Sequence, residues 1–78
     1  MSQDKEAFIV PTEYLKPVDH LSAIVLALTF NGLNHLLTTS GLEFEATEQE
    51  LKNTLSTFSL RKIDVSVVKK EDLLQSQS

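Results

Sequence analysis

The feature that most constrains the fold is a run of 23 residues, from His20 to Leu42, that contains no Lys, Arg, Asp or Glu. Its apolar centre, residues 22–37, reads SAIVLALTFNGLNHLL. The run is long enough to cross a bilayer. Polar residues interrupt it, however, no basic cluster flanks it and it has no aromatic belt, so its composition argues against a membrane span. We therefore expect the run to be buried within a soluble domain or against a partner.

A strand is one interpretation of the first half of this run. Large and small side chains alternate from Ala23 to Phe30, and the pair Asn31-Gly32 suits a tight turn. Residues 33–39 do not alternate well enough to form the returning strand. A lone strand followed by a short helix capped by Asn31 is the remaining form of this interpretation.

A helix over about residues 20–39 is the interpretation that we favour. A step of about 100° per residue gives such a helix two apolar sectors. The first contains Leu21, Ile24, Val25, Leu28 and Leu36, and the second contains Leu26, Phe30, Leu33 and Leu37. Gly32 costs about 1 kcal/mol in a helix interior and marks a possible bend, and Gly41 is placed to end the helix in the left-handed conformation. A helix of this kind is central in its fold, or packs on its own chain with one sector and on a partner with the other.

The segment before the run predicts helical structure. Thr12 can cap a short helical turn that Pro17 limits, because the residue before a proline avoids helical geometry. Asp19 stands where the cap of the next helix is expected.

The segment after the run predicts a strand, a helix and a second strand. Leu42–Ala46 alternates apolar and acidic residues, as a half-buried strand does. Thr47 and Glu50 have the spacing of a capping box, and an apolar stripe for the helix follows at Leu51, Leu55 and Phe58. Ile63, Val65 and Val67 alternate with polar residues and predict a second strand that ends at Lys69-Lys70.

These elements predict an α+β fold: an N-terminal helical segment with a long central apolar helix, then a strand-helix-strand unit. Residues 6–74 form one small domain on this prediction, and residues 1–5 and 75–78 are flexible ends. Two strands alone are weak and leave their edges exposed. Pairing with Ala7–Val10 as a third strand, or with the same sheet of a second chain, would relieve that exposure.

The size of the chain predicts self-association. A domain of 78 residues buries only about 60–65 % of the surface of its unfolded chain. The chain has no cysteine, so neither disulfides nor thiolate-bound zinc can reinforce the core. We therefore expect dimerisation to complete the fold.

Charge and the N-terminal sequence bear on partners and location. A net charge of −4 argues against broad attraction to nucleic acid or to an anionic membrane. The N-terminal segment contains Asp4 and Glu6, and its longest apolar run is the four residues Ala7–Val10. A secretory signal has a basic start and a longer apolar run, so this segment is not one. We expect a cytoplasmic protein.

Residues 46–70, ATEQELKNTLSTFSLRKIDVSVVKK, show one resemblance to a known family. The segment is similar to the first helix and second strand of an RNA-recognition motif. That family binds RNA through aromatic side chains on two strand motifs, and the strand Leu42–Ala46 offers only Phe44. We interpret the similarity as general strand-helix-strand patterning and assign no family from it.

The sequence contains no arrangement that predicts catalysis, a bound metal or a cofactor. In a continuous helix His20 and His35 would lie about 22 Å apart, too far to share a metal. Glu43 and Glu45 would lie on one strand face about 6.5–7 Å apart, which alternation explains as a solvated face.

We therefore expect a small non-enzymatic protein-protein interaction module, an adaptor, inhibitor or regulator, that binds itself as a homodimer and a further protein. The predicted partner-binding residues are Leu26, Phe30, Leu33 and Leu37. The predicted charged rim comprises Glu43, Glu45, Glu48, Arg61, Lys62, Lys69 and Lys70. The alternative is a dimeric nucleic-acid-binding regulator that uses the four basic residues of that rim.

Overall fold

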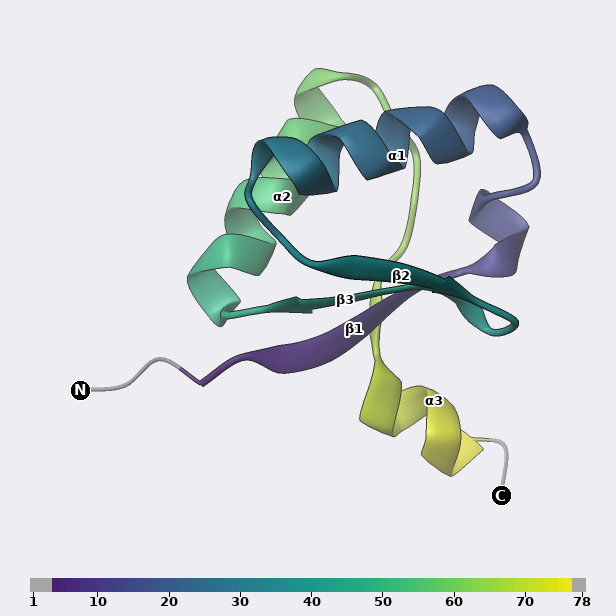
Figure 1. Cartoon of the computed structure of the whole chain (residues 1–78), viewed down its shortest axis with the longest axis vertical. Helices are drawn as coiled ribbons and strands as arrows, with labels where there is room; N and C mark the ends of the chain where they lie inside the picture. The colour runs from purple at the N-terminus through teal and green to yellow at the C-terminus, as the bar shows by residue number, and fades with distance from the viewer. Residues whose placement is uncertain (1–3, 77–78) are drawn as a thin grey trace.

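A computed structural model describes residues 4–76 of the chain (Figure 1). Its elements in order are β1 (Glu6–Pro11), a 3-10 turn η1 (Thr12–Tyr14), α1 (Val18–Phe30), β2 (His35–Thr38), β3 (Gly41–Ala46), α2 (Glu48–Leu60), β4 (Val68–Lys69) and α3 (Lys70–Ser76). The expected α+β class is confirmed. The expected flexible ends lie partly outside the described residues.

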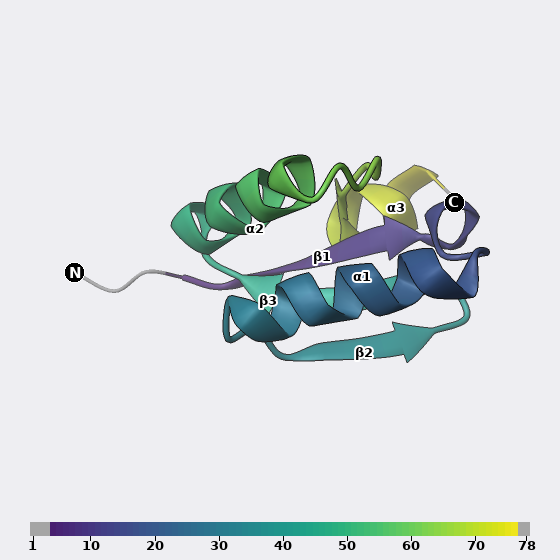
Figure 2. The ribbon, with the colours of Figure 1, turned by 90° about the horizontal axis from the view of Figure 1, so that it is seen from above.

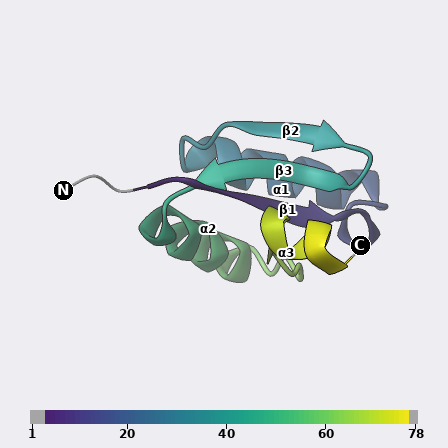
Figure 3. The same ribbon diagram turned by 90° about the horizontal axis from the view of Figure 1, so that it is seen from below.

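The four strands form one antiparallel sheet in the order β2-β3-β1-β4. The two units β1-α1-β2 and β3-α2-β4 interleave, which is the ferredoxin-like βαββαβ topology. Helices α1 and α2 cover one face of the sheet, and the short α3 lies on the opposite face (Figures 1 and 3). Below, the first face is called the helix face and the second the open face.

The core lies between the helix face and the two long helices. In the strands Phe8 and Val10 of β1 and Leu42 and Phe44 of β3 point into it, and the rings of Phe8 and Phe44 have centroids 5.7 Å apart. The remaining core residues are Leu15, Ile24, Ala27, Leu28, Leu33, Ala46, Phe58 and Ile63. The alternation predicted for the strand Leu42–Ala46 is therefore confirmed, since Glu43 and Glu45 lie on the other face.

The short helical turn predicted after Thr12 is confirmed as η1, but the described chain begins with a strand and not with a helical segment. β1 pairs with β3 on one side and with β4 on the other, so the third strand suggested for Ala7–Val10 is confirmed and is central. Thr12 makes no side-chain cap, and the residue at the N-terminal cap of η1 is Pro11. Helix α1 likewise begins after Pro17 rather than after Asp19, which lies in its first turn.

The helix favoured for the first half of the charge-free run is confirmed, since α1 covers residues 18–30, but its predicted extension to residue 39 is wrong. Gly32 has a φ of 71°, and the N–H groups of Gly32 and Leu33 donate to the carbonyls of Thr29 and Leu28. These two bonds are those of a Schellman motif, which ends a helix at a left-handed residue. Gly32 therefore stops the helix instead of bending it.

Gly41 was predicted to end a helix, and this prediction is wrong. It begins β3 after a two-residue hairpin loop. Its φ is 143°, and a Cβ there would collide with the carbonyl oxygen of Val10. Glycine is required because the chain reverses directly against β1.

The second predicted strand is confirmed only at its C-terminal end. Residues 63–67 are not in a regular element, and β4 contains only Val68–Lys69. β4 pairs with β1 and not with β3, so the two strands around α2 are not neighbours. The capping box of α2 is confirmed: the N–H of Glu50 donates to the Thr47 hydroxyl at 3.1 Å, and the N–H of Thr47 donates to the Glu50 carboxylate at 2.9 Å.

Within residues 4–76, the helices are too short or too polar to cross a membrane.

Candidate interaction surface

The C-terminal half of α1 exposes two large apolar side chains. Ile24, Ala27 and Leu28 face the sheet and are fully buried. Leu26 and Phe30 are one helical turn apart on another side of the helix, and their exposed fractions are 59 % and 76 %. The predicted second sector of the helix is thus exposed at these two positions.

The other two residues of the predicted set lie elsewhere. Leu33 follows the helix, packs into the core and is only 4 % exposed, so it has to be removed from the predicted partner surface. Its burial fits the Schellman motif, in which the residue after the left-handed position contacts the last turn of the helix. Leu37 lies in β2 and is 58 % exposed, so it belongs to the edge of the sheet rather than to a helix.

The exposed residue that sequence reasoning missed is Leu36. Helical periodicity assigns it to the first apolar sector, but in β2 it is 65 % exposed. A Leu-Leu pair in a strand puts one side chain on each face, and on an edge strand both stay partly in solvent. The local signal was the short group His35–Thr38, which has no charge and follows a left-handed glycine.

The ladder between β2 and β3 shows which backbone groups of β2 are used. The N–H of Glu45 donates to the carbonyl of Asn34 at 3.3 Å, and the hairpin pairs Leu36 with Glu43 and Thr38 with Gly41. Every second residue of an antiparallel strand bonds to the same neighbour. The N–H and C=O groups of His35 and Leu37 therefore point away from β3.

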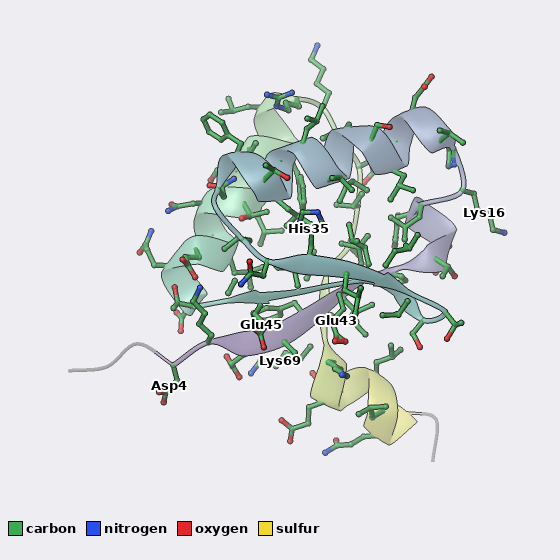
Figure 4. The ribbon with its side chains drawn as sticks, in the orientation of Figure 1. Asp4, Lys16, His35, Glu43, Glu45 and Lys69 are labelled. Atoms are coloured by element: carbon green, nitrogen blue, oxygen red, sulfur yellow. The ribbon has the colours of Figure 1, made fainter. Side chains whose placement is uncertain are left out.

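The side chains of β2 divide between the two faces of the sheet. His35 lies opposite Phe44 and points toward α1, whereas Leu36 lies opposite Glu43 on the open face (Figure 4). Figure 2 shows β2 as the outermost strand, with α1 above the sheet and not beyond it. The outer edge of β2 is therefore accessible.

Two cations of the predicted rim are engaged within the chain. Lys70 Nζ lies 3.0 Å from one carboxylate oxygen of Glu43 and donates to the other at 3.1 Å. Lys69 Nζ lies 3.5 Å from a carboxylate oxygen of Glu6. These pairs connect β4 and α3 to β1 and β3, so they help to fix the last elements on the sheet.

The rest of the rim is spread over the molecule. Glu45 is exposed on the open face, and Glu48 pairs with Lys52 one turn along α2 at 3.6 Å. Arg61 and Lys62 lie at the C-terminal end of α2. The four cations predicted for nucleic acid thus do not form one free group, because half of them face carboxylates.

Glu50 is the ionisable group with the clearest shift. The bond from the Thr47 N–H lowers the pKa of its carboxyl below 4.5, partial desolvation opposes this, and Lys5 at 3.6 Å adds to the lowering. The cause is structural, since the charged carboxylate completes the capping box.

The two histidines make local backbone contacts. His20 Nδ1 lies 2.7 Å from the carbonyl oxygen of Tyr14, and His35 Nδ1 lies 3.2 Å from that of Leu33. Within the part of the chain that the structure describes, no three His, Asp or Glu side chains are grouped as metal ligands.

The open face lacks the stacking surface of an RNA-recognition motif. In residues 4–76 its strand side chains are Ala7, Ile9 and Pro11 of β1, Glu43 and Glu45 of β3, Leu36 and Thr38 of β2, and Val68 of β4. The strand aromatics Phe8 and Phe44 face the helices. The similarity of residues 46–70 to that family therefore does not extend to its base-binding groups.

A groove of about 450 Å³ lies on the open face where α3 meets β1. Its lining includes Ala7 and Leu74 together with Lys69, Lys70 and Glu71. Since the lysines are held by Glu6 and Glu43, this groove belongs to the packing of α3 on the sheet.

No protein-family model, curated protein or solved structure matches the chain, so its function is inferred from its own residues.

Proposed function

We propose that the chain is a small non-enzymatic protein-protein interaction module that forms a homodimer and binds a further protein as an adaptor, inhibitor or regulator. One observation carries the proposal. The charge-free run exposes large apolar side chains on two elements: Leu26 and Phe30 on α1, and Leu36 and Leu37 on β2. Single exposed apolar residues are ordinary, whereas four large ones from one uncharged segment leave a substantial apolar area for a partner to cover.

The small core supports the same proposal. Each of these four side chains gains about 1–2 kcal/mol when its exposed area is covered, which is a large fraction of the stability of a small domain. With no cysteine to form a disulfide, an interface is the available source of added stability.

The alternative, a nucleic-acid-binding regulator, has weaker support. Lys69 and Lys70 would have to leave Glu6 and Glu43 to meet phosphates, and acidic side chains would stay beside them. A steep loss of DNA affinity with salt, reduced in a Lys69→Ala, Lys70→Ala variant, would favour this alternative over the proposal.

Sedimentation from low micromolar to millimolar concentration tests the proposal. We expect a monomer-dimer equilibrium that is lost in at least one of two variants, Leu26→Asp with Phe30→Asp or Leu36→Asp with Leu37→Asp. The matched control is Val18→Asp with Leu60→Asp, which also charges two highly exposed apolar positions but lies outside the run. A strictly monomeric chain, or association unchanged in both variants, would refute the proposal.

A further inference from the structure

The two edges of the sheet differ in what they offer to another strand. β4 is two residues long and carries Lys69, whereas β2 is four residues long and has no charged side chain. Proteins commonly protect edge strands with lysine, proline, bulges or very short length. Of these protections β2 has only its modest length. The backbone groups of its His35 and Leu37 point outward.

We infer that the homodimer forms by antiparallel pairing of β2 with β2 of a second copy. The two sheets then join into one continuous sheet, with four strands from each copy. This inference rests on the proposed self-association and names the surface that carries it. Another extended strand presents backbone donors and acceptors at the spacing that matches these outward groups.

The register follows from the outward groups. A two-fold axis through Leu36 places His35 of each copy opposite Leu37 of the other. Both are hydrogen-bonded pairs, so the interface contains about four backbone hydrogen bonds. In this register the two Leu36 residues face each other as a non-hydrogen-bonded pair, in which side chains approach most closely. Registers centred one residue to either side would leave His35 or Leu37 without a partner residue in the β2 strand of the other copy.

The absence of charge on β2 lets a second copy occupy this edge. Each chain has a net charge of −4, so two copies repel each other least where they meet through a neutral surface. β2 lies within the run that has no charged side chain. The nearest acidic groups, Glu43 of each copy, would be about 14 Å apart, beyond the Debye length at physiological salt, and each is paired with its own Lys70.

The same pairing at β4 is unfavourable. Two β4 strands would offer only two residues each and would bring the Lys69 residues of the copies together. The sheet therefore extends in one direction, and the assembly closes as a dimer instead of growing into a fibre.

In this dimer the exposed apolar residues of β2 lie at the interface between the copies, and those of α1 remain available to another protein. The two-fold axis is perpendicular to the sheet, so α1 of both copies lies on the same face. Leu26 and Phe30 stay exposed there, and the dimer presents two copies of this surface to the further protein.

A single-cysteine variant tests the register directly. The chain has no native cysteine, so Leu36→Cys introduces the only thiol. Its Cα separation across the axis, about 4.5 Å, is within the range of a disulfide. With oxidised glutathione as the oxidant, we expect Leu36→Cys to form covalent dimers at least about tenfold faster than Leu26→Cys, a control of similar exposure at 59 %.

A proline variant tests the backbone pairing. The N–H of Leu37 points outward, so Leu37→Pro removes a donor of the interface without removing a bond to β3. We expect it to be monomeric, with the circular dichroism of the folded chain. Leu37→Ala keeps the N–H and should still dimerise, more weakly.

The outcomes separate the two proposals. A dimeric wild type, fast cross-linking of Leu36→Cys and a monomeric Leu37→Pro support strand pairing. A dimeric wild type whose Leu36→Cys variant cross-links no faster than Leu26→Cys overturns strand pairing and leaves self-association intact. A wild type that is monomeric at millimolar concentration overturns both. If Leu37→Pro does not fold, the cross-linking comparison alone decides.

Discussion

Gly32 and Lys62 occupy the same position at the ends of the two long helices. Their φ angles are 71° and 59°, and each is followed by an apolar residue that returns into the core, Leu33 or Ile63. The N–H of Ile63 donates to the carbonyl of Phe58 at 2.8 Å, as that of Leu33 does to Leu28 at 3.0 Å. Both helices thus end in a Schellman motif, but only one has the glycine that this conformation favours.

Lys62→Gly should therefore stabilise the protein. A side chain in the left-handed conformation costs about 1–2 kcal/mol, and the greater freedom of glycine in the unfolded chain offsets part of the gain. We expect a net increase of about 0.5–1 kcal/mol in the free energy of unfolding, measured by urea denaturation. Arg61→Gly is the control, because Arg61 has a φ of −90° and should gain nothing. Equal effects of the two substitutions would contradict this explanation.

Local signals in the sequence were sufficient where one short motif determines the structure. Thr47 and Glu50 bind each other's backbone groups within one turn, so their spacing alone predicted the start of α2. Leu42–Ala46 alternates because one face packs on helices and the other carries acidic groups. Neither prediction needed contacts from elsewhere in the chain.

The same approach failed at Asn31–Leu33, because apolar spacing continues through the end of the helix. Leu33 is buried by the turn and Leu37 stands on a strand, yet both lie at helical spacing from Phe30. Periodicity cannot separate these cases. The pair Asn31-Gly32 is the signal that separates them, because Gly32 ends the helix and does not form the turn of a hairpin.

The sequence suggests β1 only as an optional third strand, because its apolar residues do not alternate with polar ones. Phe8 and Val10 face the helices, while Ile9 faces the open side and is still only 2 % exposed. α3 packs against β1 on that side. A strand covered on both faces has a continuous apolar run, which is also compatible with a helix. The ion pairs of Lys69 and Lys70 could not be predicted either, because they depend on the order of the strands in the sheet.

Thr54 gives a second prediction, since its hydroxyl is buried without a hydrogen-bond partner among the described residues. Such a group costs about 1–2 kcal/mol of desolvation. Thr54→Val keeps the shape and removes the hydroxyl, so we expect the protein to be about 1 kcal/mol more stable, with a melting temperature about 4–8 °C higher.

Thr57→Val is the matched control for Thr54→Val. The Thr57 hydroxyl donates to the carbonyl of Asn53 at 3.0 Å and accepts from Asn31 at 3.3 Å. The same substitution should therefore destabilise by about 0.5–1 kcal/mol. A Thr54→Val variant that loses stability would show that the buried hydroxyl is satisfied in solution.

Glu50 predicts a specific dependence of stability on pH. Its pKa is lowered in the folded chain, so its charge stabilises the fold fully above the unfolded value of 4.5. That stabilisation should decrease as the pH falls from 4.5 through the lower folded pKa. Glu50→Gln can still accept the bond from Thr47 but does not titrate. The stability difference between wild type and this variant should therefore shrink on acidification.

Chemical denaturation at several pH values, with Glu48→Gln as the control, measures this effect. Glu48 is in the same first turn but takes no part in the capping box, and it pairs with Lys52. The Glu48→Gln variant should follow the wild-type pH profile more closely than Glu50→Gln does. Parallel curves for Glu50→Gln and wild type would mean that the carboxylate is not what stabilises this helix start.

The two glycines give the last prediction, since both have positive φ but different surroundings. A Cβ at Gly41 would collide with the carbonyl oxygen of Val10, whereas nothing lies within 4 Å of a Cβ at Gly32. Gly32→Ala should cost about 1 kcal/mol, the conformational term alone. Gly41→Ala adds the displacement of β1 from β3 and should cost at least about 2 kcal/mol more. Thermal unfolding of both variants measures the difference, and equal losses would show that the hairpin can move away from β1 without strain.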